Sequence, residues 1–347
     1  MSVTAIQLPR TTLIERLAKP KPMLILFAIM WVPLTLYVMF DLSDLILLPA
    51  IPATIALYVV CLWAFRESTV ALIGLTLVFF WLILAVSAPY LPLLDPNKPI
   101  APFAAPWSEK KDTFFVLGSD FKGRDMLSRV IWGCQRVLIW GVSATAVAYV
   151  IGTLLGLTAG YLSGWWDEAI SFIGNVFLSF PVMVLFIVIL NYLGPSGFNI
   201  VIAVTFASAP AIMRIVRGLT LDVKTRDYVY AAQTRGEHPL YIMVVELLPN
   251  VRGPLIVDAC LRLGYTTVAI TTLTFLGLGL QPPDPDWGLM IRESARVAML
   301  WKFSYMLLVP ALSVSSLASR PLLSRSCNIW ATMVISKAER SSLTAAI

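Results

Sequence analysis

Side chains that could do chemistry are concentrated in two polar stretches, residues 117–136 and 227–250, which lie among long apolar runs. The second stretch holds the one histidine of the chain, His238, and a single histidine cannot build a metal cluster alone. The four cysteines lie far apart, without the paired spacing of a zinc site. The sequence contains no Gly-x-x-x-x-Gly-Lys-[Ser/Thr] phosphate loop, no Gly-x-Ser-x-Gly elbow and no His-Glu-x-x-His motif. We therefore expect no catalytic, cofactor-binding or metal-binding residues in this chain.

The second polar stretch has the local signals of two short helices separated by a break. Asp227 is the predicted N-cap, Gly236 the residue just past the first helix, and Pro239 the first residue of the second helix. The small pair Ala231 and Ala232 gives the first helix a low face that another protein could approach closely.

This stretch resembles the cytoplasmic coupling segment of ABC importer permeases, whose pattern is Glu-Ala-Ala, three residues, Gly, nine residues and Ile-x-Leu-Pro. Tyr230 stands where the pattern has Glu, and Glu246 stands where it has Ile. The resemblance implies a set of residues that couple the chain to an ATPase: Tyr230, Ala231, Ala232, Gly236, Leu248, Pro249 and Asn250.

The first polar stretch is similar to the Gly-Thr-Asp-x-x-Gly-Arg-Asp-x-x-Ser-Arg signature of the C-type subunit of dipeptide and oligopeptide permeases, with Ser119 in place of Thr. Apolar residues recur at helical spacing on one face of residues 126–134. We expect an amphipathic helix at the outer membrane interface, ahead of the next span. The signature residues are Gly118, Asp120, Gly123, Arg124, Asp125, Ser128 and Arg129.

The composition predicts a membrane protein. Hydrophobic residues make up 58% of the 347 residues and charged residues 13%, whereas soluble domains average roughly 45–50% and 25%. The net charge of +6 does not indicate nucleic-acid binding, because the basic residues lie mainly between apolar runs, where membrane topology uses them. Eight apolar runs have the length of a span: residues 23–40, 45–65, 70–94, 137–161, 170–193, 198–217, 254–280 and 301–317.

We expect an all-α fold, a polytopic transmembrane helical bundle. The resemblance implies a type I ABC importer permease core of six spans, preceded here by two further spans. The chain then divides into an N-terminal extension (1–66), a permease domain (67–317) with its coupling segment (218–253), and a Ser/Arg-rich tail (318–347). The tail lacks the Asn-x-x-Gly-Asp-x-x-Arg-Asp ending of the family, so the alternative is a non-transporting remnant of such a permease with a frameshifted or degraded C-terminus.

Basic residues predict the orientation. Four precede the first span and six surround the coupling segment, and an even number of intervening spans places both groups in the cytoplasm. The loop 95–136 is then outside, although its seven Lys and Arg residues argue against that side.

Small and charged residues within the apolar runs suggest close contacts. Gly152, Gly156, Gly160 and Gly164 recur every four residues, which favours a close helix contact in lipid, either within the chain or with a partner subunit. Arg262 is a charge inside an apolar run, so it faces a cavity or a partner, or else it snorkels to the inner surface.

The resemblance implies an inner-membrane permease subunit of a bacterial, ATP-driven peptide importer. Its implied partners are a homologous permease subunit, two ABC ATPase subunits that bind ATP, a periplasmic or extracellular peptide-binding protein, and membrane lipid. Members of the family also carry nickel chelates and glutathione, so the substrate stays open. The competing class, a secondary transporter, would show two related halves with broken spans, and no such repeat is found.

Overall fold

The computed structural model describes residues 49–64, 69–298 and 304–317. The predicted span 23–40 and the predicted tail 318–347 lie outside these residues.

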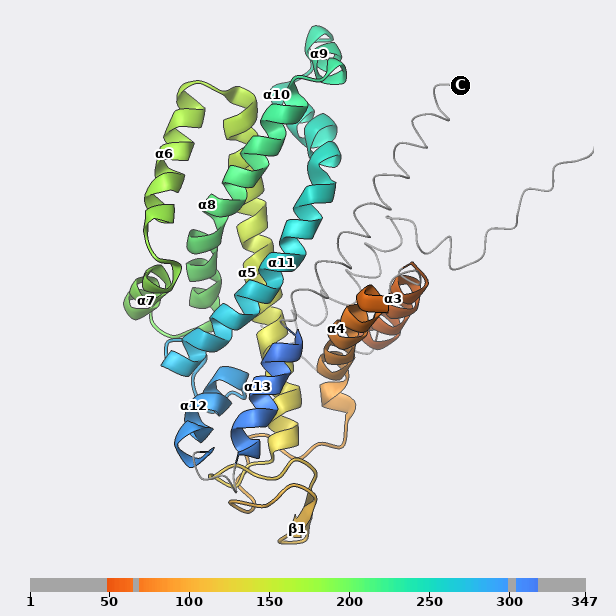
Figure 1. The fold of residues 1–347 in the computed structure, drawn as a ribbon, viewed down its shortest axis with the longest axis vertical. Helices are drawn as coiled ribbons and strands as arrows, with labels where there is room; N and C mark the ends of the chain where they lie inside the picture. Colours follow the sequence, from red (N-terminus) through yellow and green to blue (C-terminus); the bar gives the residue numbers. More distant parts are fainter. Residues whose placement is uncertain (1–48, 65–68, 299–303, 318–347) are drawn as a thin grey trace, which may run out of the picture.

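The described chain is mostly helical (Figure 1), which confirms the predicted all-α class. Its two strands form one antiparallel hairpin, in which Ser108 pairs with Phe115 and Lys110 with Thr113. In chain order the elements are α3 (Ala50–Ala64), α4 (Thr69–Ser87), the 3₁₀ helix η2 (Ala88–Tyr90), β1 (Ser108–Lys110), β2 (Thr113–Phe115), α5 (Met126–Leu162), α6 (Trp165–Ser179), α7 (Val182–Leu193), α8 (Gly197–Lys224), α9 (Asp227–Thr234), α10 (Pro239–Tyr241), the π-helix η3 (Ile242–Leu247), α11 (Leu248–Leu276), α12 (Trp287–Ala298) and α13 (Tyr305–Leu317).

Four of the described helices are long and apolar enough to cross a membrane, and a fifth span results if the bent pair α6 and α7 is counted as one. The four helical stretches are Leu72–Tyr90, Met126–Leu162, Gly197–Lys224 and Pro239–Leu276. The predicted spans 45–65 and 301–317 correspond to shorter apolar helices, α3 and α13, of 15 and 13 residues.

The predicted span 170–193 corresponds to the bent pair α6 and α7 and not to one continuous helix. The axes of α6 and α7 differ by 92° across a short break. Phe180 has an extended backbone (φ −84°, ψ 138°) because the ring of the following Pro181 disfavours the helical conformation for the residue before it.

The separate interfacial helix predicted before residue 137 was also wrong, because α5 continues without interruption for 37 residues. Ser128 and Arg129, which we expected on its polar face, are fully buried and have polar partners inside the protein. Both faces of the first turns of α5 are thus covered by protein, and these turns continue directly into the rest of the helix.

Glycines of α5 form a close seam with α8. A Cβ atom added at Gly152 would lie 2.7 Å from the Cβ of Ile212, one at Gly156 2.5 Å from that of Val216, and one at Gly160 2.7 Å from that of Thr220.

These contacts support the interpretation of the stripe as packing within one chain. Gly164 lies outside the seam, because α5 ends at Leu162 and no atom lies within 4 Å of its added Cβ.

The two polar stretches lie at opposite ends of the bundle. In Figure 1 the loop that carries β1 lies at one end and α9 at the other, with α5 extending between them. One core cluster packs α5, α8 and the segment after α8 near α9, and a second packs α4, α5, α12 and α13 near the β1 loop.

Candidate functional site

The segment around α9 begins and ends close to the predicted residues. Its N-cap is Arg226, with an extended backbone, so the prediction of Asp227 as the cap was wrong by one residue. Asp227 lies in the first turn instead, where a negative charge interacts favourably with the helix N-terminus. Gly236 follows the C-cap with φ +77°, a left-handed conformation that glycine adopts without strain.

We predicted a short second helix in this segment, but that helix continues into the following span. Pro239 begins it, and the Nδ1 of His238 accepts a hydrogen bond from the Leu240 N–H at 3.3 Å. The π-helix η3 then leads into α11, so that Pro239–Leu276 forms one helical stretch of 38 residues. The widened turn ends just before Pro249, whose ring would clash with a carbonyl in a regular α-helix.

The inner face of the coupling segment packs on the ends of α5 and α8. The buried residues that form this face are Val229, Ala232, Ile242, Met243 and Leu247. The opposite face carries large side chains that are 45–60% exposed, namely Tyr230, Leu240, Tyr241, Val244 and Val245.

The predicted low face formed jointly by Ala231 and Ala232 was therefore wrong. Ala231 is exposed, whereas Ala232 has no exposed surface and belongs to the protein's own core. The two residues are adjacent in the sequence, and successive residues of a helix point about 100° apart.

Glu246, which occupies the Ile position of the family pattern, makes a weak ion pair across the break. Its carboxylate lies 3.8 Å from the Nη2 atom of Arg235, and Arg235 also lies 3.7 Å from the carboxylate of Glu237. Exposed pairs of this length contribute little to stability. Of the remaining predicted coupling residues, Leu248 is partly buried, while Pro249 and Asn250 are exposed.

At the other end of the molecule, the signature residues form a compact turn. The Asp120 carboxylate accepts hydrogen bonds from the backbone N–H groups of Lys122 and Arg124, both at 2.9 Å, and from the Arg124 Nε at 2.6 Å. Gly118 (φ +80°) and Gly123 (φ +86°) supply the left-handed conformations of this turn.

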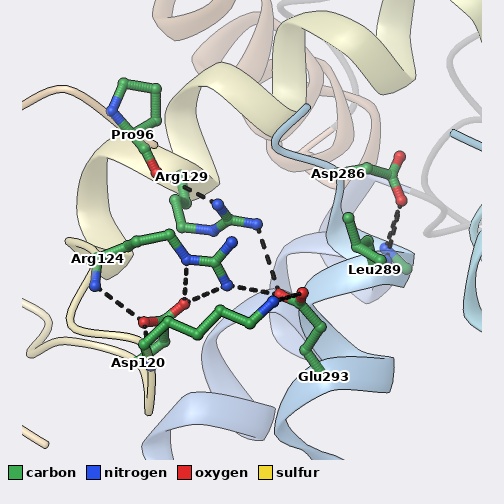
Figure 2. Close-up of polar contacts among 9 residues, drawn as sticks. Pro96, Asp120, Arg124, Arg129, Asp286, Leu289 and Glu293 are labelled. Atoms are coloured by element: carbon green, nitrogen blue, oxygen red, sulfur yellow. Dashed lines mark hydrogen bonds and ion pairs between the residues drawn. The ribbon is translucent and has the colours of Figure 1, made fainter. Parts of the chain in front are cut away.

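The turn is bound to α12, nearly 170 residues further along the chain, through Glu293 (Figure 2). The Glu293 carboxylate accepts from the Lys122 Nζ and from the Arg124 Nη2, both at 2.5 Å. The Nη2 of the fully buried Arg129 lies 3.8 Å away, while its Nη1 donates to the Pro96 carbonyl at 3.2 Å. Glu293 was missed from the sequence because no local spacing connects it to residues 117–136.

Two aspartates hold the starts of the helices that meet here. Asp125 caps α5, since its Oδ2 accepts from both the N–H and the hydroxyl of Ser128 at 2.8 Å. Asp286 caps α12, since its Oδ1 accepts from the N–H groups of Gly288 and Leu289. Trp287, fully buried, donates from its Nε1 to the Val130 carbonyl of α5 at 2.9 Å.

Arg262, predicted to face a cavity or a partner or else to snorkel, makes an ion pair within its own helix. Its Nε donates to the Oδ2 of Asp258 at 2.7 Å, and the same oxygen accepts from the Tyr149 hydroxyl of α5. No group of three or more His, Cys, Asp or Glu side chains that could hold a metal ion occurs among the described residues.

Comparison with known proteins assigns the chain to a family. Residues 152–320 match the family described as "Binding-protein-dependent transport system inner membrane component". The chain is also 32% identical over 256 residues to the dipeptide transport system permease protein DppC of Haemophilus influenzae, which covers 73% of this chain and 86% of that protein. The chain belongs to this permease family. The resemblance seen in the sequence is confirmed.

Other members have related names. The permease is 36% identical to the di/tripeptide transport system permease protein DppC of Pseudomonas aeruginosa, over 67% of this chain and 77% of that protein. It is 34% identical to the probable D,D-dipeptide transport system permease protein DdpC of Escherichia coli, over 66% and 76%. Among solved structures, it is similar to an inward-facing MetNI methionine ABC transporter (17% identity, TM-score 0.49, 60% of this chain and 97% of that one).

The chain is thus a permease subunit of the ABC peptide-importer family, an integral membrane protein of a class that does not itself hydrolyse ATP. These relatives give no support to the secondary-transporter alternative.

Proposed function

We propose that this permease imports peptides across the inner membrane of a bacterium. It forms the translocation path with a homologous permease subunit, receives substrate from an external peptide-binding protein, and is driven by ATP that two partner ATPase subunits bind and hydrolyse. The names of its relatives, which include dipeptide and di/tripeptide permeases, support peptides as the substrate class.

The observation that carries the coupling role is the two-sided form of the segment from α9 to η3. One side is buried against α5 and α8, and the other presents exposed Tyr230, Leu240 and Tyr241 at the end of the bundle away from the β1 loop. Exposed apolar side chains gathered at a polar end of a membrane protein indicate a contact with another protein.

In the proposed mechanism, ATP binding closes the pair of ATPase subunits, and α9 carries that motion into the membrane helices. Because Val229 and Ala232 belong to the same core cluster as Val216 and Val223 of α8, a displacement of α9 is transmitted to α8 through that packed core. Displacement of the span then opens the path to one side of the membrane or to the other.

The test is substitution of the exposed alanine. We expect Ala231→Glu to reduce co-purification with the ATPase subunits and ATP-driven peptide uptake by tenfold or more, since it adds bulk and charge to the docking face. The matched control is Ala105→Glu, which changes another exposed alanine, in the loop at the other end. Equal complex yield and equal uptake for the two variants would remove Ala231 from the coupling surface.

Ala232→Glu should behave differently. The new carboxylate would be buried without a partner, at a cost of several kcal/mol, so we expect loss of the folded permease itself rather than loss of docking alone. Thermal unfolding of the isolated subunit separates these two effects.

A further inference from the structure

The group formed by Tyr149, Asp258 and Arg262 has no part in the coupling segment or in the ion network around Glu293. Asp258 Oδ2 accepts from the Arg262 Nε at 2.7 Å and from the Tyr149 hydroxyl, so that α5 and α11 are joined at this point. The side chains of Arg262 and Asp258 keep 22% and 24% of their surface exposed.

On α5 the group lies near the middle of an uncharged stretch. Residues 137–162 of α5 contain no charged side chain, and Tyr149 is twelve and thirteen residues from the two ends of this run. At 1.5 Å per residue, that places it roughly 18–20 Å from each end. Arg262 is held there by Asp258 through its Nε, which does not fit a side chain that snorkels to the surface.

A charged pair at this depth is costly if it faces lipid, so its exposed part is expected to face a water-filled path or a partner subunit. The hydrogen bond between Arg262 and Asp258 uses the Nε and the Oδ2, and the guanidinium also hydrogen-bonds the Tyr149 side chain. Of the five N–H groups of a guanidinium, these two contacts leave three, and the Oδ1 of the carboxylate also takes part in neither of them.

We propose that Arg262 binds the terminal carboxylate of the peptide during its passage, with Asp258 and Tyr149 holding the guanidinium in place. The terminal nitrogens of an arginine match the two oxygens of a carboxylate and bind them as a pair. Asp258, already paired with Arg262, prevents the guanidinium from holding the substrate so tightly that release becomes slow. This inference rests on the proposed peptide-import function.

The experiment uses the complete importer in liposomes, with alanyl-alanine and its C-terminal amide as substrates, each supplied at a concentration that saturates the peptide-binding protein. We expect Arg262→Gln to slow uptake of the free dipeptide about tenfold and that of the amide by no more than about twofold. Asp258→Asn should retain the preference for the free carboxylate, because the guanidinium remains.

The matched control is Arg217→Gln, which removes an arginine from another Arg–Asp pair, with Asp167, between α8 and α6. Loss of a pair with a purely structural role should change the uptake of both peptides by the same factor. If Arg262→Gln does not assemble, the double variant Asp258→Asn/Arg262→Gln leaves no unpaired charge and should also lose the preference.

Loss of uptake by one common factor for both peptides in the Arg262 variants would overturn this inference and leave the import function standing. An unmodified importer that transports neither peptide would overturn both.

Discussion

Two acidic residues at the end of the bundle that carries the β1 loop, Asp286 and Glu293, have pKa values shifted in opposite directions. Burial alone would raise the pKa of Glu293, but hydrogen bonds from Lys122 and Arg124 and their positive charges hold it below its usual range. Burial raises the pKa of Asp286 to about 6, because its main partners are backbone N–H groups and these only partly offset desolvation. The Glu293 carboxylate thus joins two distant segments, whereas the burial of the Asp286 carboxylate opposes folding.

Glu293→Ala should destabilise the permease. Arg124, whose side chain is 7% exposed, would retain Asp120 but lose its second carboxylate, and Arg129 would lose its nearest acid. Removing one member of a buried ion network costs about 3 kcal/mol. Thermal unfolding of the detergent-purified subunit measures the loss, and Glu109→Ala on the exposed β1 hairpin is the control, with an expected change below about 0.5 kcal/mol. Similar melting temperatures for the two variants would contradict the role of Glu293.

Asp286→Asn should change how stability depends on pH. The folded-state pKa of Asp286 is about 6, above the ordinary value of 3.8, so the folded protein binds a proton that the unfolded chain has already released. This contribution is fully present below about pH 4 and is lost as the pH rises through about 6.

The free energy of unfolding of the asparagine variant does not fall in this way as the pH rises. Its side-chain amide keeps an oxygen that accepts from the Gly288 and Leu289 N–H groups. We expect its advantage over the unmodified protein to grow from near zero at pH 4 to at most about 3 kcal/mol at pH 7, since each pKa unit corresponds to about 1.4 kcal/mol. Melting temperatures between pH 4 and 8 check this, and Glu293 titrates equally in both proteins. A constant difference across the range would contradict the assigned pKa.

At the scale of elements, the central feature is the contact of α5 with α8. Three glycines at four-residue spacing let Ile212, Val216 and Thr220 approach the α5 backbone. In lipid, where no hydrophobic force draws helices together, such close contact provides dispersion attraction between them.

Gly156→Ala should separate the two helices. Its Cβ would lie 2.5 Å from the Val216 Cβ and 2.7 Å from the Met213 carbonyl oxygen, and backbone cannot yield as a flexible side chain does. We expect a loss of about 1–3 kcal/mol, typical of overpacking. Gly218→Ala in α8 is the control, since no atom lies within 4 Å of its added Cβ. The melting temperatures of the two variants test this expectation. Equal values would contradict the close packing of α5 against α8.

Local signals in the sequence predict much of this architecture but not the relations between distant elements. The start of the second coupling helix at Pro239 and the turn at Gly236 were predicted because proline fixes φ near the helical value and glycine tolerates a positive φ. The inward orientation of Ala232 and the pairing of Arg124 with Glu293 depend on how distant helices pack, which no local spacing specifies. The bend before α7 was missed although Pro181 marks it, because the apolar run continues through it.

In the molecule as a whole, the β1 loop and α9 lie at opposite ends of the bundle (Figure 1). A membrane crossed by α5 and α8 would separate them. This arrangement supports an outer position for the loop 95–136, despite its basic residues, if the coupling segment meets an ATPase in the cytoplasm.

Cysteines placed at the two ends should therefore react differently. In a background without native cysteines, Asp112→Cys in the exposed hairpin turn should be labelled by a membrane-impermeant thiol reagent added to intact cells, and Thr225→Cys, exposed just before α9, should not. Thr225→Cys should become reactive once the membrane is permeabilised, which serves as the control. Reversed labelling would overturn the proposed orientation.

The length of α5 has a consequence for how the two sides of the membrane communicate. Its 37 residues measure about 55 Å, nearly twice the roughly 30 Å of a bilayer's hydrocarbon core. Near one end Arg129 meets the Glu293 network, and near the other Tyr161 packs with the coupling segment and accepts from Gln233. Because one continuous helix contacts both the Glu293 network and the coupling segment, the two ends of the bundle are mechanically connected. A displacement of this helix would move both contacts together, so that a change at one face of the membrane would be transmitted to the other.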